Sequence, residues 1–192
     1  MEKLEVLVEV SARHVHLSKE HVEILFGKGA VLTPKRDLSQ PGQFLCNERV
    51  NLVGPRNRID NVAVLGPERS ATQVEVSLTD ARMLGVTAPV RESGDIAGTG
   101  SIVIEGPNGT IEISEGVIAA KRHVHVSAED AAKYGLKDKQ IVKVKVEGDR
   151  PLIFDDVVIR VSDKFATAMH IDVDEANAAG ASGKGMGEVI VD

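Results

Sequence analysis

Alternation of apolar and polar residues runs through most of the chain and predicts β-strands. Residues 4–16 (LEVLVEVSARHVH) and 116–126 (GVIAAKRHVHV) predict two long strands, and shorter alternating runs fill much of the remainder. The Asn-Gly pair within residues 101–113 predicts a hairpin with a tight turn. Residues 28–43, with two prolines and several polar positions, predict a loop. The chain is therefore expected to be mainly β.

Short helices are predicted where a capping residue precedes a brief apolar stripe. Ser18 can cap one such helix, and Ser127 with Asp130 predicts a capping box at the start of another. Residues 79–85 predict a third helix behind a threonine cap, and residues 174–180 a fourth. Short strands at this spacing, with only a few one-turn helices, are typical of small barrels and not of a doubly wound sheet.

The composition limits the cellular compartment and the classes of binding partner that fit this chain. The chain of 192 residues has one cysteine, Cys46, so an intramolecular disulfide is impossible and a reducing compartment fits best. A formal net charge of -6 argues against a nucleic-acid partner. No apolar run is long enough to cross a bilayer, and the N-terminal residues do not resemble a signal peptide. These features predict a cytoplasmic protein without a membrane partner.

One pattern occurs twice. Residues 10–21 (VSARHVHLSKEH) and 119–130 (AAKRHVHVSAED) both contain Arg-His-Val-His-x-Ser-x-Glu, and the two copies of this motif use four of the six histidines of the chain. His14 and His123 are 109 positions apart, from 123 minus 14. In each copy a strand runs into a capped helix. We therefore predict two related β units, each with such a strand at its mouth.

The histidine pairs suit metal binding. Residues i and i+2 of a strand point to the same face, so His14 lies beside His16, and His123 beside His125. Adjacent imidazoles repel each other when protonated, but as metal ligands they supply two nitrogens held at a fixed angle. A pair of exposed strand histidines is the alternative interpretation, and the repetition disfavours it.

A metal site needs a third protein ligand. The candidates are His170, where an alternating run gives way to acids, and Glu75, an acid within the strand-like run TQVEVSL. Each also has a purely structural interpretation. Arg69, six residues before Glu75, could clamp a phosphate or could be a solvated turn arginine. Cys46 has no neighbouring base and fits a small buried residue better than a nucleophile.

Five ordered motifs give the chain a family resemblance. SARHVHLS, PGQF, LGPERSATQVEVSLTDA, GVIAAKRHVHVS and AMHIDVDEANAAG resemble the phosphate propanoyltransferase family, the PduL-type phosphotransacylases, over nearly the whole chain. The resemblance implies transfer of a short acyl group, propanoyl or acetyl, between coenzyme A and inorganic phosphate. It also implies two small related β-barrels with short capping helices, an interleaved topology and two zinc ions per chain.

The resemblance also assigns the site residues. The first zinc would be held by His14, His16 and Glu75, with an open position for the sulfur of coenzyme A. The second would be held by His123, His125 and His170, completed by water. Arg69 would hold phosphate. From these assignments we expect phosphate to attack the zinc-bound thioester directly, without an acyl-enzyme intermediate.

The interleaved topology predicts two barrels. Residues 3–12 with 121–192 would form barrel one, and residues 13–120 barrel two. The resemblance implies a homodimer. Microcompartment members of the family carry an amphipathic targeting helix, whereas here the first predicted strand begins almost at Met1. We therefore expect a cytoplasmic enzyme, with a place among the enzymes inside a bacterial microcompartment as the other option.

Two alternatives from other classes stay open. Glu20 and Glu129 follow the His-x-His pairs as in the first motif of a cupin-like metal-binding barrel enzyme, although no histidine occurs between His21 and His123. A non-catalytic structural protein with incidental histidines is the other alternative.

Overall fold

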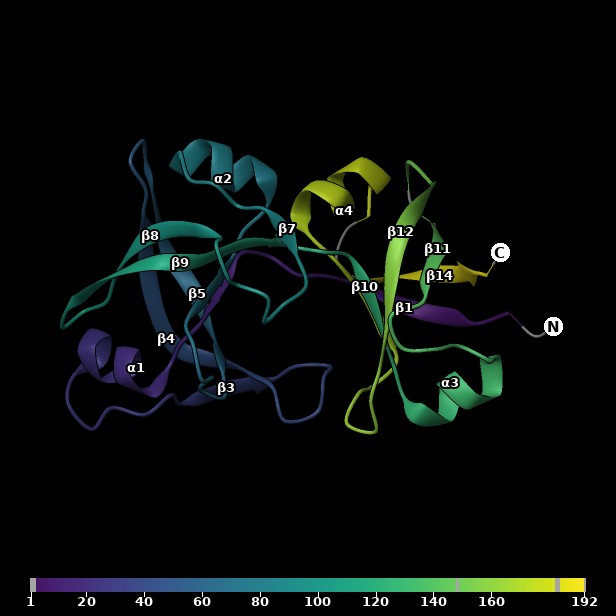
Figure 1. Ribbon diagram of the computed structural model, residues 1–192, viewed down its shortest axis with the longest axis horizontal. Coiled ribbons are helices and arrows are strands. Elements are labelled where there is room, and N and C mark those ends of the chain that lie inside the picture. Colours follow the sequence, from purple (N-terminus) through teal and green to yellow (C-terminus); the bar gives the residue numbers. More distant parts are fainter. Residues whose placement is uncertain (1–2, 148, 182–183, 192) are drawn as a thin grey trace. The chain divides into compact units, whose positions relative to one another are not determined.

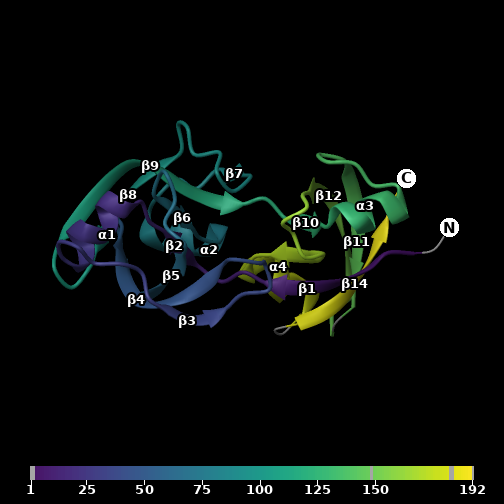
Figure 2. The ribbon, with the colours of Figure 1, turned by 90° about the horizontal axis from the view of Figure 1, so that it is seen from below.

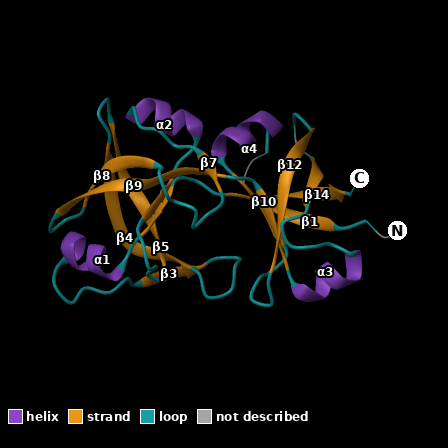
Figure 3. Ribbon diagram, viewed as in Figure 1, coloured by secondary structure: helices purple, strands orange, loops and turns teal. Residues whose placement is uncertain are grey.

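The computed structural model describes residues 3–147, 149–181 and 184–191, and the chain divides into two compact units (Figure 1). The terminal unit consists of Met1–Ala12, Ser39–Pro41 and Lys121–Asp192, and the central unit of Arg13–Leu38 and Gly42–Ala120. Most of the ordered backbone is strand, with four short helices in the described residues (Figure 3).

The terminal unit contains a closed barrel of six strands. They follow one another in the order β1-β13-β10-β12-β11-β14, and β14 pairs with β1 to close the barrel. The strands are β1 (Glu5–Val10), β10 (His123–Val126), β11 (Ile141–Val146), β12 (Leu152–Val161), β13 (Ala168–Ile171) and β14 (Lys184–Ile190). Helices α3 (Ala128–Tyr134) and α4 (Val173–Ala179) belong to the same unit.

The central unit contains a second six-stranded ring. Its order is β4-β5-β2-β6-β9-β8, and β8 pairs with β4 to complete it, while β3 extends β4 and β7 extends β9. The strands are β2 (His14–His16), β3 (Pro34–Asp37), β4 (Phe44–Val53), β5 (Arg58–Gly66), β6 (Gln73–Glu75), β7 (Val90–Arg91), β8 (Gly100–Glu105) and β9 (Thr110–Ala120). Its helices are α1 (Lys19–Phe26) and α2 (Leu78–Leu84).

The two barrels have the same strand pairing. Strand β10 lies between β12, which is parallel to it, and β13, which is antiparallel, and β2 has the same relations to β5 and β6. Strands β1 and β9 also occupy equivalent places, each parallel to one neighbour and antiparallel to the other. Because β1 precedes β2 and β9 precedes β10, each half of the sequence supplies its first strand to the other barrel. The predicted pair of related, interleaved β-barrels is confirmed.

The two long strands predicted from alternation are each divided in the structure. Residues 4–16 form β1 and β2 with a break after Val10, and residues 116–126 belong to β9 and β10 with a break after Ala120. Figure 2 allows the chain to be followed from β1 to β2 and from β9 to β10. The prediction of one continuous strand was wrong because alternation reports which face of a strand is buried and not which sheet it joins.

Three local predictions also need correction. Residues 34–37, within the predicted loop 28–43, form β3, an exposed strand that begins at Pro34. Such a place suits proline, which cannot donate to a ladder. The cap of α2 is Ser77, whose side chain accepts from the Asp80 N–H, and not Thr79. Residues 39–41, assigned by sequence to barrel two, lie in the terminal unit, where the Gln40 side chain bonds the backbone of Ala166.

Each unit has its own apolar core. Fully buried side chains of the terminal unit include Val6, Val8, Ile159, Met169 and Ile171. Those of the central unit include Leu17, Leu25, Leu52, Leu84 and Ile104. Burying each such side chain contributes roughly 1.5–3 kcal/mol. The cores therefore hold the two histidine strands, whose central Val15 and Val124 are both fully buried.

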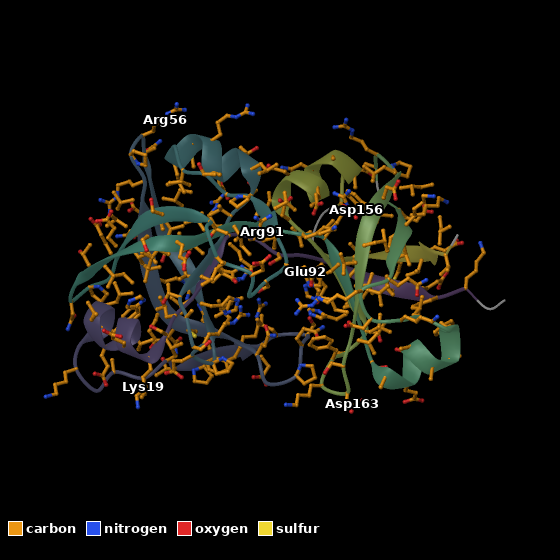
Figure 4. The ribbon with its side chains drawn as sticks, viewed as in Figure 1. Lys19, Arg56, Arg91, Glu92, Asp156 and Asp163 are labelled. Atoms are coloured by element: carbon orange, nitrogen blue, oxygen red, sulfur yellow. The ribbon has the colours of Figure 1, made fainter. Side chains whose placement is uncertain are left out.

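Charged side chains lie mainly on the surface, as Lys19 at the start of α1, Arg56 between β4 and β5 and Asp163 after β12 illustrate (Figure 4). In the part of the chain that the structure describes, no helix has the length and apolar character needed to cross a membrane.

Candidate metal centre

The first histidine pair lies buried in the central barrel. His14 and His16 are 5 % and 3 % exposed, and their ring centroids are 5.0 Å apart with the planes perpendicular. The core residue Val15 lies between them and anchors the strand. The alternating pattern therefore places both imidazoles on one side of β2, as the sequence predicted.

Strand pairing brings Glu75 to this pair. The antiparallel register of β2 and β6 sets Glu75 opposite His14. Glu75 Oε2 lies 3.4 Å from His14 Nε2, and Oε1 lies 4.0 Å from His16 Nε2. One ligand atom from each of the three residues lies within 4.8 Å of the others. Two imidazoles and one carboxylate form a donor set that zinc accepts, with a fourth position for another ligand.

The electrostatics of this group favour metal-binding protonation states. Burial lowers the pKa of His16 to about 2, with His14 and Arg69 adding to the effect, so the imidazole is neutral. Burial alone would raise the pKa of Glu75, but the nearby His14 and a hydrogen bond from Ser93 outweigh it, and the pKa falls below its ordinary value. A neutral imidazole and an ionised carboxylate are the forms that bind metal.

Arg69 lies in the same unit, beside the start of α1. Its backbone N–H donates to the Leu17 carbonyl at 2.9 Å, and it forms an isolated bridge with Ser18. Its guanidinium Nη1 donates to Ser93 Oγ at 3.0 Å. The structure thus places Arg69 one hydroxyl away from Glu75, since Ser93 in turn donates to Glu75 Oε1 at 2.9 Å.

Two residues around Glu75 were not predicted. Gln73 Nε2 donates to Glu75 Oε1 at 2.6 Å, and its position two residues earlier on β6 was a signal that sequence could have used. Ser93 comes from the loop after β7, and nothing in the sequence pattern connects it to Glu75. His21, in the first turn of α1, is half-buried with its Nδ1 2.7 Å from Thr72 Oγ1.

The second histidine group lies in the terminal barrel. His170 on β13 pairs in register with His123 on β10. The ring centroids of His123, His125 and His170 lie 4.6, 5.4 and 5.0 Å apart in the order 123–125, 123–170 and 125–170. Among the described residues, the Glu75 group has ligand atoms that all lie within 4.8 Å of one another, and the three histidines of the terminal barrel do not meet this criterion.

Three further observations bear on the second group. His123 Nδ1 lies 2.8 Å from the Lys121 carbonyl, which fixes that ring and directs Nε2 the other way. Burial lowers the pKa of His125 to about 2, with the neighbouring histidines and Arg160 contributing. His125 Nδ1 is buried and meets no hydrogen-bond partner among the described residues. A neutral imidazole with an unsatisfied buried nitrogen fits a metal ligand.

The third residue of the two histidine groups is of a different type, Glu75 in one and His170 in the other, although both occupy the same place in their barrels. Glu75 lies opposite the first histidine of its motif, and His170 lies opposite the first histidine of the other. The neighbouring strand differs as well, because Glu75 pairs with Ile118 whereas His170 pairs with Glu9. Glu9 Oε2 lies 4.0 Å from His170 Nε2, so each histidine group has one acid beside it.

Comparison with known proteins identifies the family of this chain. A sequence model of the phosphate propanoyltransferase family matches residues 7–182. The chain belongs to this family. A relative from Thermotoga maritima, named phosphate propanoyltransferase, is 60 % identical over 175 residues, which cover 91 % of this chain and 83 % of the relative. Relatives of the same name from Listeria monocytogenes and Enterococcus faecalis are 58 % and 57 % identical, over 91 % and 90 % of this chain and 82 % of each relative.

The remaining candidates of the sequence are not members of the Glu75 group. Cys46 is fully buried, and burial raises the pKa of its thiol to about 12. Glu20 lies in the first turn of α1 and Glu129 in the first turn of α3. Their carboxylates stabilise the helices through a favourable interaction with the positive end of the helix dipole.

Proposed function

We propose that this protein is a phosphotransacylase that interconverts acyl-CoA plus phosphate and acyl phosphate plus CoA. The observation that carries the proposal is the convergence of His14, His16 and Glu75 in a member of the phosphate propanoyltransferase family. Propanoyl is the proposed acyl group, after the name of the relatives. Acetyl is the second candidate, because one methylene provides only about 1–3 kcal/mol of discrimination.

The residues of the site suit two zinc ions. His14, His16 and Glu75 would hold one, and His123, His125 and His170 the other. Zinc bound at the first group would supply stabilisation of a coordinating thiolate, which is the leaving group when CoA departs. The protein contributes two buried imidazoles at fixed separation, of which that of His16 is neutral, and a carboxylate that is held ionised.

Arg69 is proposed to hold the phosphate. A guanidinium presents several N–H donors in a plane and matches phosphate oxygens. Ser93 accepts a hydrogen bond from one of these donors, Nη1, and so fixes the orientation of the head group. The phosphate would then attack the thioester carbonyl, the C–S bond would break, and the electron pair would leave with the sulfur of CoA.

Direct attack without an acyl-enzyme intermediate agrees with the state of two candidate nucleophiles, Cys46 and Ser93. The Cys46 thiol is buried with a raised pKa and so is almost wholly protonated at neutral pH. The Ser93 hydroxyl has a carboxylate as acceptor, but it also accepts bonds from Arg69 and Gln73 and is fully engaged. A labelled acyl group found covalently attached to the protein would contradict direct attack.

A coupled assay tests the proposed function. Propanoyl phosphate or acetyl phosphate is offered with CoA, and thioester formation is followed with and without a chelator. We expect turnover that the chelator abolishes and added zinc restores. His123→Ala, compared with the wild type at equal zinc occupancy of the first group, tests the second group, and a full rate would remove it from the reaction.

Assembly and location are also part of the proposal. The family resemblance implies a homodimer in the cytoplasm or inside a bacterial microcompartment. Sedimentation of the purified chain tests the dimer, and its position in fractionated cells relative to shell proteins tests the location.

A further inference from the structure

One oxygen of the Glu75 carboxylate is held by the protein itself. Oε1 accepts a hydrogen bond from Gln73 Nε2 at 2.6 Å and another from Ser93 Oγ at 2.9 Å. Oε2 lies 3.4 Å from His14 Nε2. Because the hydrogen bonds from Gln73 and Ser93 go to Oε1, Oε2 is the oxygen that faces His14.

The hydroxyl of Ser93 lies at the centre of this network. It donates to Glu75 Oε1, and it accepts from Arg69 Nη1 at 3.0 Å and from Gln73 Nε2 at 2.9 Å. A serine hydroxyl has one proton to donate and two lone pairs that accept. Because an ionised carboxylate only accepts and a guanidinium only donates, the direction of these bonds is determined.

The backbone holds Ser93 in this place independently of the hydroxyl. Strand β7 pairs with β9, and Ser93 follows it after Glu92, which is labelled in Figure 4 with Arg91. The Gly94 N–H donates to Gln73 Oε1 at 2.7 Å, and the Asp95 N–H donates to the Glu92 carbonyl at 3.0 Å. The Gly94 bond also orients the Gln73 amide so that its Nε2 faces Glu75 and Ser93.

We propose that Ser93 is a positioning residue that couples Arg69 to Glu75. Its hydroxyl holds Oε1 of the carboxylate so that Oε2 faces His14, and at the same time it orients the guanidinium that holds phosphate. This inference rests on the proposed function for the role of Arg69. Ser93 itself touches no reacting atom in this role.

The test compares three variants by metal and anion binding. Ser93→Ala removes the hydroxyl, Ser93→Thr keeps it, and Ser101→Ala makes the same chemical change at an exposed position of β8. Zinc affinity is measured by competition with a chelator. The zinc-binding event that is lost in Glu75→Gln is assigned to the group of His14, His16 and Glu75. Affinity for inorganic phosphate is measured by calorimetry on the zinc-loaded proteins.

We expect Ser93→Ala to weaken zinc binding at this group by about 10–100-fold, the usual effect of losing a residue that orients a ligand. It should also weaken phosphate binding by about tenfold. Ser93→Thr should recover most of both affinities, and Ser101→Ala should match the wild type. Zinc affinity unchanged in Ser93→Ala, or a loss of only one of the two affinities, would overturn the coupling.

The two proposals fail in distinguishable ways. Neither binding measurement requires turnover. A wild-type protein that binds zinc and phosphate but catalyses no acyl transfer would overturn the proposed function, and the comparison of Ser93→Ala with Ser93→Thr would still decide the coupling.

Discussion

Arg13, the residue before the first His-x-His pair, donates a hydrogen bond from Nε to the Asp80 carboxylate at 2.8 Å. Asp80 is buried in the first turn of α2, the helix that follows the Glu75 strand. Arg122 and Glu175 repeat the relation in the other unit, with Nη1 donating at 2.9 Å to the first turn of α4. In both barrels an arginine therefore links the strand of the histidine pair to the helix after the third residue.

Replacing Arg13 should destabilise the central unit. Arg13→Met leaves the buried Asp80 carboxylate without its cationic partner, and we expect a loss of about 1–3 kcal/mol in the free energy of unfolding. Denaturant titration of the metal-free protein measures it. Arg58→Met is the matched control, because Arg58 pairs with Asp60 at 2.7 Å on the surface and such pairs contribute little. Equal losses in the two variants would show that burial of the acceptor does not matter.

The histidine positions were predictable from sequence because a strand imposes a period of two on its side chains. Placing His14 beside His16 needs no knowledge of the rest of the fold. Glu75 was harder, since its approach to His14 depends on the register of β2 with β6. The residues alone named Glu75 as a candidate but favoured a solvent-facing acid, and only the resemblance assigned it to the site.

Features that depend on strand exchange or on a loop were beyond the sequence pattern. The break between β1 and β2 falls within a run whose largely alternating pattern gives no sign of it, because each part joins a different barrel. Ser93 reaches Glu75 from 18 positions away through the path of a loop. No periodicity encodes such a contact, whereas the apolar runs that build the two cores were visible at once.

Glu175 should give the stability of the terminal unit a pH dependence. Burial raises its pKa above the ordinary value, and this outweighs the hydrogen bonds from the Asp172 backbone and Arg122. The folded state then holds the proton more tightly than the unfolded state, so stability falls as the pH rises from the ordinary glutamate pKa through the raised one. The stability of Glu175→Gln relative to wild type should therefore increase from pH 4 to about pH 7. A constant difference across that range would contradict the prediction.

Cys46 should be unreactive in the folded protein. Its side chain is fully buried, and burial raises the pKa of the thiol to about 12. We expect a thiol reagent at pH 8 to modify the chain only after denaturant is added, with one thiol then titrated. Cys46→Ala should keep the rate of acyl transfer, because the thiol takes no part in the proposed reaction. Rapid labelling of the native chain, or loss of turnover in Cys46→Ala with the fold intact, would require another account.

Glu75→Gln should separate the two metal groups. The amide keeps the size of the side chain and its bond from Ser93 but removes the negative charge, so the Glu75 group should lose zinc while the terminal unit retains its own. We expect about two zinc ions per chain in the wild type and about one in the variant, measured by elemental analysis after dialysis against trace chelator. Zinc that binds the folded state but not the unfolded state raises the melting temperature. Adding zinc to the metal-free proteins should therefore stabilise the wild type more than Glu75→Gln.

The matched change Glu115→Gln, at an exposed position of β9, should leave the zinc content unaltered. Two ions bound by Glu75→Gln would show that this carboxylate is not a ligand, and none in the wild type would remove zinc from the proposal altogether.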